Sequence, residues 1–347
     1  HINIDFGTNL PASASGTFAD FAGIKPMSEA TKAALKPAAL ANSTVLSEKS
    51  SCLCPPPPPA PPSLLATDFQ KNAAEEQHLV LGVTETSCAQ QQHNLDLLSQ
   101  LQRACEAYPS LHIVLNVFDA PPSTNVGHTC GLDELPACVL QVTNVSGHKS
   151  MFWAHEITPH FVEAGAYELV FAFDNDMEIG RFDLARAASS MLASTVSMAQ
   201  PLVSIAEGHD SCPTAANALW STRDGMEDRF KNLSSSNPLA TGCEVQQITY
   251  VENQAPILTK AAWAVVHSKL LSKLPPELFA HNNWGISDVW CPLLAHELPG
   301  NVPCAVLAAN LTTTNQCTIE QSADASAMRE GSNTTLPWIK QHYSSAW

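Results

Sequence analysis

The sequence predicts an α/β fold with a mainly parallel sheet and helices on both of its faces. The pattern of apolar segments indicates this fold, and the length and hydropathy of the chain are compatible with it. Over residues 76–347, short apolar segments typical of buried strands alternate with longer segments typical of helices. The 347 residues, 45% of them hydrophobic, are enough for one large core. The longest apolar runs are well short of a membrane span. We expect an N-terminal extension over residues 1–50, a proline-rich rod or linker over 51–75, and one domain over 76–347.

The first 75 residues contain two segments of unusual composition. Residues 1–50 are rich in Ala and Ser, with one short helix expected over residues 28–40. Residues 52–62, CLCPPPPPAPP, hold seven prolines around one alanine. Such a run adopts a polyproline II rod with a rise of about 3 Å per residue. The rod is either a stiff linker or a docking or glycosylation site, and it resembles the hydroxyproline-rich segments of plant and green-algal wall proteins.

From residue 78 onward, the expected strands and helices alternate. A long polar loop is expected over residues 119–148, and Asp183 is expected to cap the start of a helix. The expected strands are 78–83, 111–118, 167–173, 196–205, 303–310 and the start of 255–274. The expected helices are 94–106, 149–165, 183–193, the rest of 255–274, and 287–298. Ligands of such sheets bind at the carboxyl ends of the strands.

The acidic balance of the chain limits its partners. Lys and Arg total 17 and Asp and Glu total 33, which gives a formal net charge of −16. Such a surface repels phosphate backbones, so we do not expect general nucleic-acid binding. A single nucleotide remains compatible with this charge if a cation bridges its phosphates to the protein.

Eleven cysteines favour an oxidising compartment, because none forms a CxxC pair and no Cys/His spacing suggests zinc. We expect several disulfides, with Cys130 and Cys138 as the pair that staples the 119–148 loop. The odd count leaves at least one cysteine free or intermolecular.

Two further features favour the secretory-pathway lumen or the extracellular space. The chain begins at His1, which fits a signal peptide cleaved before it. Sequons for N-linked glycans occur at Asn42, Asn144, Asn232, Asn310 and Asn333. A free N-terminal histidine also suggests an alternative, a copper mono-oxygenase that binds its metal in a two-histidine brace. The α/β alternation does not suit the β-sandwich of those enzymes.

Asp174 and Asp176 form the most informative motif. The apolar run YELVFAF, residues 167–173, ends directly at Asp174-Asn175-Asp176. Two carboxylates at the end of a strand suit Mg²⁺ or Mn²⁺, which prefer oxygen ligands and keep positions open for diphosphate oxygens. Such a cation would neutralise a leaving nucleoside diphosphate. The alternative is that the two carboxylates only cap the helix that follows.

Other catalytic motifs do not fit. HEITPH, residues 155–160, places its second histidine behind Pro159 and one position too late for the helical spacing of a zinc protease. The sequence contains no GxGxxG, no P-loop, no G-x-S-x-G elbow and no cysteine in the context of a nucleophile. The carboxylates remain as the candidate site.

Three blocks of the chain resemble a family of plant, algal and bacterial glycosyltransferase-like proteins, whose plant members were once labelled as related to lysine-ketoglutarate reductase trans-splicing proteins. The first block contains ELVFAFDNDMEIGRFD and, further on, AQP at residues 199–201. The second is YVENQAPILTKAAW, residues 250–263, and the third is NNWGISDVWCPLL, residues 282–294. Their order and spacing agree with the family over roughly residues 76–320.

The resemblance implies a GT-A-like nucleotide-sugar transferase with one Rossmann-type domain. Asp174 and Asp176 would then bind the metal and the donor diphosphate, and Glu252 would line the acceptor side. The general base would be the Asp of the family's W-G-x-D, which takes the proton of the acceptor hydroxyl. In this chain Ser287 holds that position and Asp288, our candidate base, follows one residue later.

The chain departs from the family pattern at a second place, and it carries a cysteine pair that concerns the fold. The family carries a histidine after its last strand that could complete metal binding, whereas TTTNQ, residues 312–316, has none. Cys212 and Cys243 bracket the variable segment between the first two blocks and are expected to form a disulfide.

Two functions follow from the sequence. The first is a secretory-pathway glycosyltransferase that uses Mn²⁺ or Mg²⁺, a nucleotide sugar, and a glycan or glycoprotein acceptor. The alternative is a catalytically inactive GT-A-like protein that serves in a cell wall, surface or filament, with an extracellular protein partner packed on the polyproline segment.

Overall fold

The computed structural model describes residues 78–120, 129–205, 244–279, 285–313 and 333–343. The helix expected over residues 28–40 and the proline rod lie outside these ranges. The strands are β1 (Val80–Thr86), β2 (Leu111–Val117), β3 (Val139–Thr143), β4 (Leu169–Ala172), β5 (Val196–Ile205), β6 (Val245–Gln247), β7 (Ile257–Thr259) and β8 (Val302–Thr313).

The helices of the described ranges lie between these strands and after the last one. The α-helices are α2 (Gln91–Ala107), α4 (Lys149–Glu156), α5 (Pro159–Ala164), α6 (Leu184–Ala193), α10 (Lys260–Lys269), α11 (Pro276–Phe279), α12 (Ile286–Glu297) and α14 (Thr335–His342). Two short 3₁₀ helices are η2 (Ile179–Arg181) and η3 (Leu271–Lys273).

The eight strands form one sheet in the order β3-β2-β1-β4-β7-β5-β8-β6. Strand β1 pairs in parallel with β2 and β4, β2 with β3, and β5 with β8. Strand β7 runs antiparallel to its neighbours β4 and β5, and the edge strand β6 runs antiparallel to β8. The prediction of a mainly parallel sheet in an α/β fold is confirmed.

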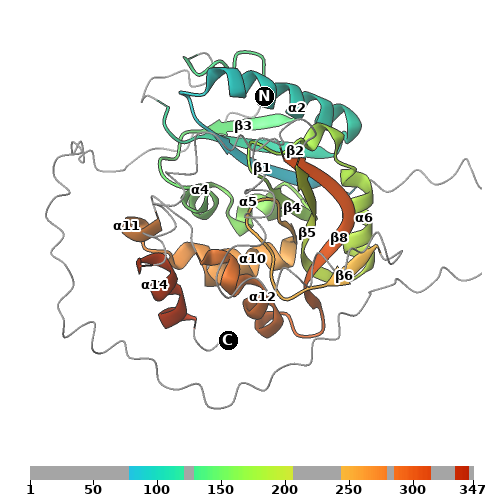
Figure 1. Cartoon of the computed structure of the whole chain (residues 1–347), viewed down its shortest axis with the longest axis vertical. Helices are drawn as coiled ribbons and strands as arrows, with labels where there is room; N and C mark the ends of the chain where they lie inside the picture. Colours follow the sequence, from blue (N-terminus) through green and yellow to red (C-terminus); the bar gives the residue numbers. More distant parts are fainter. Residues whose placement is uncertain (1–77, 121–128, 206–243, 280–284, 314–332, 344–347) are drawn as a thin grey trace, which may run out of the picture. The chain divides into compact units, whose positions relative to one another are not determined.

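Helices cover both faces of the sheet, because the strands bury apolar side chains on both sides (Figure 1). In β4, Leu169 and Phe171 join one apolar cluster, which also takes in residues of α2, η2 and α6. Their neighbours Val170 and Ala172 join a second cluster with α4, α5, α10 and α12. Since successive side chains of a strand point to opposite faces, this continuous apolar run fits a strand buried on both sides.

Two predicted elements differ from the structure. The region 119–148 is not all loop, because its residues 139–143 form β3, an edge strand whose Leu140 is 53% exposed. The helix predicted over 149–165 is two helices, since the chain leaves α4 before Pro159 and restarts with the Thr158 hydroxyl accepting a hydrogen bond from Phe161 N at 3.2 Å. The predicted cap is confirmed: Asp183 Oδ1 accepts a hydrogen bond from Arg186 N at 3.1 Å.

The described ranges contain three disulfides, which fit a secreted protein. They are Cys88–Cys130, Cys105–Cys138 and Cys291–Cys304. The predicted pair of Cys130 and Cys138 is wrong, because each of them bonds instead to a cysteine at or near an end of α2. Cys212 and Cys243 lie outside the described residues. Within the described ranges, no helix combines the length and apolarity that a membrane crossing needs.

Candidate functional site

The candidate site lies at the carboxyl edge of the sheet, where the parallel strands β1, β4 and β8 end (Figure 1). Strand β1 lies between β2 and β4, so the connections of the chain diverge there, and open α/β sheets bind ligands at such a point. Glu85 is the penultimate residue of β1, Asp174 follows β4 by two residues, and Thr313 ends β8.

The turn that carries the two aspartates is tied to two neighbouring segments. Asp174 N donates to the carbonyl of Gln254 at 2.8 Å. On the other side, Asp176 Oδ2 accepts a hydrogen bond from Thr313 Oγ1 at 3.2 Å, and Glu178 N donates to Thr312 O at 2.8 Å. The aspartates therefore do not cap the following helix, whose cap is Asp183, and their turn joins the loop before β7 to the end of β8.

Lys149, the first residue of α4, supplies a positive charge to this turn. Its Nζ lies 2.5 Å from Asp174 Oδ1 and 2.9 Å from the carbonyl oxygen of Asn253. The Lys149 side chain is 9% exposed and that of Asp174 is 28% exposed. This ion pair is therefore shielded from water on its lysine side. We call Lys149, Asp174, Asp176, Glu252 and Asn253 the β4 end of the sheet edge.

The pKa values of two carboxyl groups near Lys149 are raised. Burial raises the pKa of Glu85 to about 8, and the charge of Asp174 adds to the rise while Lys149 opposes it. Burial also raises the pKa of Asp174 to about 6, against the effect of Lys149. The charges of Asp176 and Glu252 contribute further to this second rise. One ammonium therefore does not offset the carboxylates of the cluster, which disfavour each other's ionised forms.

Glu252 is held in one orientation by its neighbours. Its Oε2 accepts a hydrogen bond from Tyr250 Oη at 2.9 Å, and its Oε1 accepts from Asn253 N at 3.0 Å and from Ser287 Oγ at 3.3 Å. The backbone N–H of Glu252 donates to Gln200 Oε1 at 2.8 Å. The second and third sequence blocks thus meet at this carboxylate, with a glutamine of the first.

Ser287, and not Asp288, contacts Glu252 from the start of α12. Ser287 is buried, and Asp288 stands one residue further along the first turn, where its N–H donates to Gly285 O at 3.2 Å. Burial holds the pKa of Tyr250 well above its usual range, and the charges of Glu252 and Asp288 raise it further. Asp288 is therefore near enough for its charge to affect the pKa of Tyr250. Trp284 of the same block lies outside the described residues.

The donor set of this turn meets part of what a divalent cation needs. Mg²⁺ and Mn²⁺ accept one or two carboxylates when substrate phosphates complete their coordination, so the oxygen ligands of the turn are of the right chemistry. Within the described ranges, no three His, Cys, Asp or Glu side chains are grouped to hold a metal on their own. The residues fit a cation shared with a bound diphosphate, and they do not form a complete protein cage.

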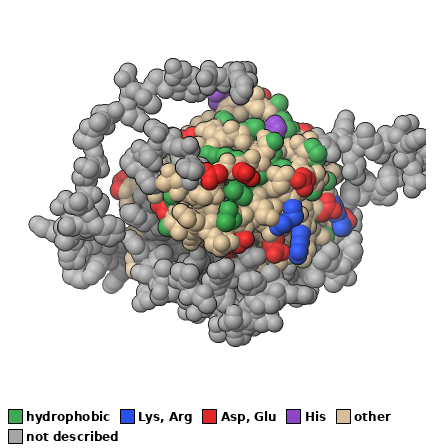
Figure 2. Space-filling model, turned by 90° about the horizontal axis from the view of Figure 1, so that it is seen from above, with side chains coloured by type: hydrophobic (Ala, Val, Ile, Leu, Met, Phe, Trp, Pro, Cys, Tyr) green, Lys and Arg blue, Asp and Glu red, His purple; other side chains and the backbone are tan. Residues whose placement is uncertain are grey.

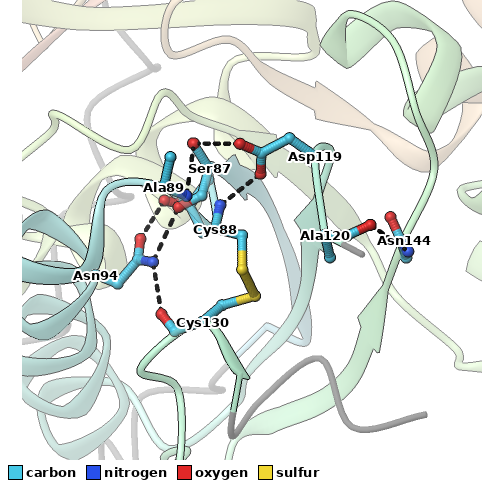
Figure 3. The surroundings of a disulfide bond; sticks show 9 residues. Ser87, Cys88, Ala89, Asn94, Asp119, Ala120, Cys130 and Asn144 are labelled. Atoms are coloured by element: carbon cyan, nitrogen blue, oxygen red, sulfur yellow. Dashed lines mark hydrogen bonds between the residues drawn. A yellow bond between two sulfur atoms is a disulfide. The ribbon is translucent and has the colours of Figure 1, made fainter. Parts of the chain in front are cut away.

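A second polar cluster lies at the neighbouring ends of β1 and β2 (Figure 3). We call Ser87, Cys88, Asn94, Asp119 and Cys130 the β1–β2 end. Ser87 Oγ donates to Asp119 Oδ2 at 2.6 Å, and Cys88 N donates to Asp119 Oδ1 at 2.5 Å. Asn94, fully buried in α2, donates to the carbonyls of Ser87 at 3.0 Å and Cys130 at 2.9 Å. The Cys88–Cys130 disulfide closes this network.

The sequons within the described ranges have exposed asparagines. Asn144 follows β3, with its Nδ2 donating to Ala120 O at 3.2 Å (Figure 3). Asn310 lies in β8, and Asn333 precedes α14. Asn42 and Asn232 are outside the described residues. Figure 2 shows acidic side chains spread over the visible face and basic side chains gathered at one side, as the net charge of −16 leads one to expect.

Sequence reasoning found Asp174, Asp176, Glu252 and Asp288 but missed their main partners. Lys149 and Glu85 were missed because a lone charged residue at a strand or helix end gives no motif. A usable signal was present for Glu85, which ends an apolar strand run just as Asp174 follows one. No protein-family model matches the chain, and a search of curated proteins found no similar protein.

Proposed function

We propose that the chain is a glycosyltransferase-like protein of the secretory pathway, in its lumen or outside the cell, that binds a nucleotide-sugar donor at the β4 end. The observation that carries the proposal is the convergence of residues far apart in the sequence. Asp174 is influenced by the charge of Glu252, and Glu252 accepts a hydrogen bond from Ser287. Three separate sequence blocks thus supply one polar cluster, rich in carboxylates, at a switch point of the sheet.

The charge of this cluster defines the role of a cation. A diphosphate is anionic, so it approaches several carboxylates only when a positive charge lies between them. A carboxylate of this turn, on Asp174 or Asp176, would hold Mn²⁺ or Mg²⁺, which when bound supplies charge neutralisation for the departing nucleoside diphosphate. The three disulfides support a secretory location for such a reaction.

Glu252 and Asp288 would act on the acceptor in the proposed reaction. Glu252 is fixed by three hydrogen bonds, so it is suited to orient an acceptor hydroxyl. Asp288 is the candidate base, because a carboxylate must take the hydroxyl proton as the new glycosidic bond forms. Both side chains act on Tyr250, whose raised pKa keeps its hydroxyl protonated and able to donate.

One observation favours the second candidate function, an inactive GT-A-like protein with a structural or assembly role outside the cell. The side chain that meets Glu252 from α12 is the neutral Ser287, which cannot serve as the carboxylate base. A protein of this kind would bind an extracellular protein partner through its polyproline segment and would not turn over a sugar nucleotide.

Thermal unfolding in the presence of nucleotides separates the two functions. UDP, GDP and their sugars are tested with and without Mn²⁺ on the wild type, on Asp176→Ala and on Asp96→Ala, which removes an exposed carboxylate of α2. A ligand at 100 times its dissociation constant adds about 2.7 kcal/mol, which is readily measured. The transferase predicts a Mn²⁺-dependent shift that is lost only in Asp176→Ala. No shift with any nucleotide favours the structural function.

A further inference from the structure

Lys149 distinguishes the β4 end from a simple site of two aspartates. It begins α4, Asp174 follows β4, and Asn253 belongs to the loop before β7, at sequence separations of 25 and 104 residues from the lysine. Its ammonium contacts both of these residues. One side chain therefore joins three segments that come together only in the folded protein.

The ammonium of Lys149 is committed to these contacts. A lysine has three N–H donors, and two of them make the bonds to Asp174 Oδ1 and Asn253 O. The same Nζ lies 5.7 Å from the centre of the Trp153 ring, and the lysine side chain is 9% exposed. A buried ammonium needs its carboxylate, since removing one partner of a buried pair leaves an uncompensated charge.

A divalent cation would compete with this ammonium for Asp174. A metal bound to a carboxylate lies about 2.0–2.6 Å from its oxygen. Bound to Asp174, it would place two or more like charges within a few ångströms of each other, where their repulsion is strong in a partly dry site. The ammonium and a metal ion are therefore alternative partners of this one carboxylate.

The pair also fixes the geometry between the two acidic segments. Asp174 N donates to Gln254 O at 2.8 Å, while Asn253 N donates to Glu252 Oε1 at 3.0 Å. The Lys149 bond to Asn253 O closes this set of contacts. Movement of the lysine would thus displace the turn after β4 relative to the loop that carries Glu252.

We propose that Lys149 is a built-in counter-ion that reserves Asp174, so that Asp174 is a positioning residue and not a ligand of the divalent cation. Together the two residues hold the turn of Asp176 against the loop of Glu252. The inference rests on the proposed function, because it divides the roles of the two aspartates within that site.

The test measures two properties of the wild type, Asp174→Asn, Asp176→Asn and Lys149→Met. The first is Mn²⁺ affinity by calorimetry in the presence of UDP or GDP, and the second is urea unfolding without metal. We expect Asp176→Asn to weaken Mn²⁺ binding by about tenfold or more with little change in the unfolding midpoint. Asp174→Asn should lower the midpoint and keep Mn²⁺ affinity within about threefold of the wild type. Lys149→Met should lower the midpoint without weakening Mn²⁺ binding, because it removes the competitor for Asp174.

Two further variants guard against loss of folding. Lys149→Arg keeps the positive charge and should retain most of the unfolding midpoint that Lys149→Met loses. If Asp174→Asn does not fold, the double variant Lys149→Met with Asp174→Asn removes both buried charges and replaces it in the comparison.

The outcomes separate this inference from the function on which it rests. Equal loss of Mn²⁺ binding in Asp174→Asn and Asp176→Asn overturns the role given to Lys149 and leaves the proposed function standing. Absence of Mn²⁺ binding by the wild type with either nucleotide overturns the proposed function, and the division of roles with it.

Discussion

The β1–β2 end and the β4 end lie side by side on one sheet edge, yet they accommodate buried polar groups in different ways. At the β1–β2 end, Asp119 is matched by a hydroxyl and a backbone N–H, and a disulfide closes the network. At the β4 end, one ammonium lies among several carboxylates, and the pKa of Asp174 is raised. The pKa of the neighbouring Glu85 in β1 is raised as well.

This difference teaches where to look for chemistry in a fold of this kind. A network whose carboxylate is matched by hydrogen-bond donors stabilises one arrangement and has little left to offer a ligand. A cluster with unbalanced charge favours the binding of a cation or a proton, because either one relieves the repulsion. Substitutions at each end test this contrast, and the largest change in stability is expected at Lys149.

The strongest way to break the contrast is Lys149→Met. It leaves Asp174 without its buried cation, and loss of one partner of a buried pair costs about 3–5 kcal/mol of unfolding free energy. Lys260→Met is the matched control, because its salt bridge to Glu163 is exposed, and such pairs contribute about 0–1 kcal/mol. Urea unfolding of both variants measures the difference. Equal losses would contradict the special role of the β4 end.

The disulfide of the β1–β2 end is the next test. Replacing Cys88 and Cys130 by serine removes a link across 42 residues and should lower the unfolding free energy by about 3 kcal/mol. Because this end is structural, any Mn²⁺-dependent nucleotide binding should remain at temperatures where the variant is folded. Calorimetry together with urea unfolding checks both halves of the prediction, and a loss of binding in folded protein would show that the two ends act together.

The pH dependence of stability should report the charge imbalance through Glu85. Its pKa in the folded protein, about 8, lies above its ordinary value of 4.5, so its stabilising contribution is full below pH 4.5 and is lost as the pH rises through 8. Each pKa unit corresponds to about 1.4 kcal/mol, and because Glu85 is partly exposed we expect a fall of about 2 kcal/mol.

The comparison for this effect is the variant Glu85→Gln, which cannot titrate at that position. Unfolding free energies of both proteins are measured from pH 5 to pH 8.5. The wild type should lose stability relative to the variant as the pH rises. A constant difference across this range would show that Glu85 does not hold its proton in the folded state.

The smallest effect is expected at Asn144, beside the β1–β2 end. Its Nδ2 bond to Ala120 O is exposed, so Asn144→Gln should change stability by about 0.5 kcal/mol or less. If the sequon carries a glycan in secreted protein, the variant loses it, which mass spectrometry detects after glycosidase treatment. A large loss of stability in protein without glycan would mean that this loop is tied more firmly than its exposure indicates.

The fold class could be predicted from the sequence because both of its signals are local. Apolar runs such as YELVFAF mark strands buried on two faces, and the helical pattern of 94–106 marks α2. Elements that were missed, such as β3, β6, α11 and α14, are short or half exposed. Such elements depend on their neighbours for stability, so they leave a weak signal in the chain.

Local sequence patterns were enough to predict the α/β alternation, the carboxylates at the end of β4 and the candidate acidic residues of the later blocks. The partners of these and other residues became evident only in the folded chain: Cys88 for Cys130, Lys149 for Asp174, and Ser287 for Glu252. The physical reason is that alternation depends on contacts between near neighbours in the chain. Each of these pairs spans 25 residues or more and forms only after the sheet has brought distant segments together.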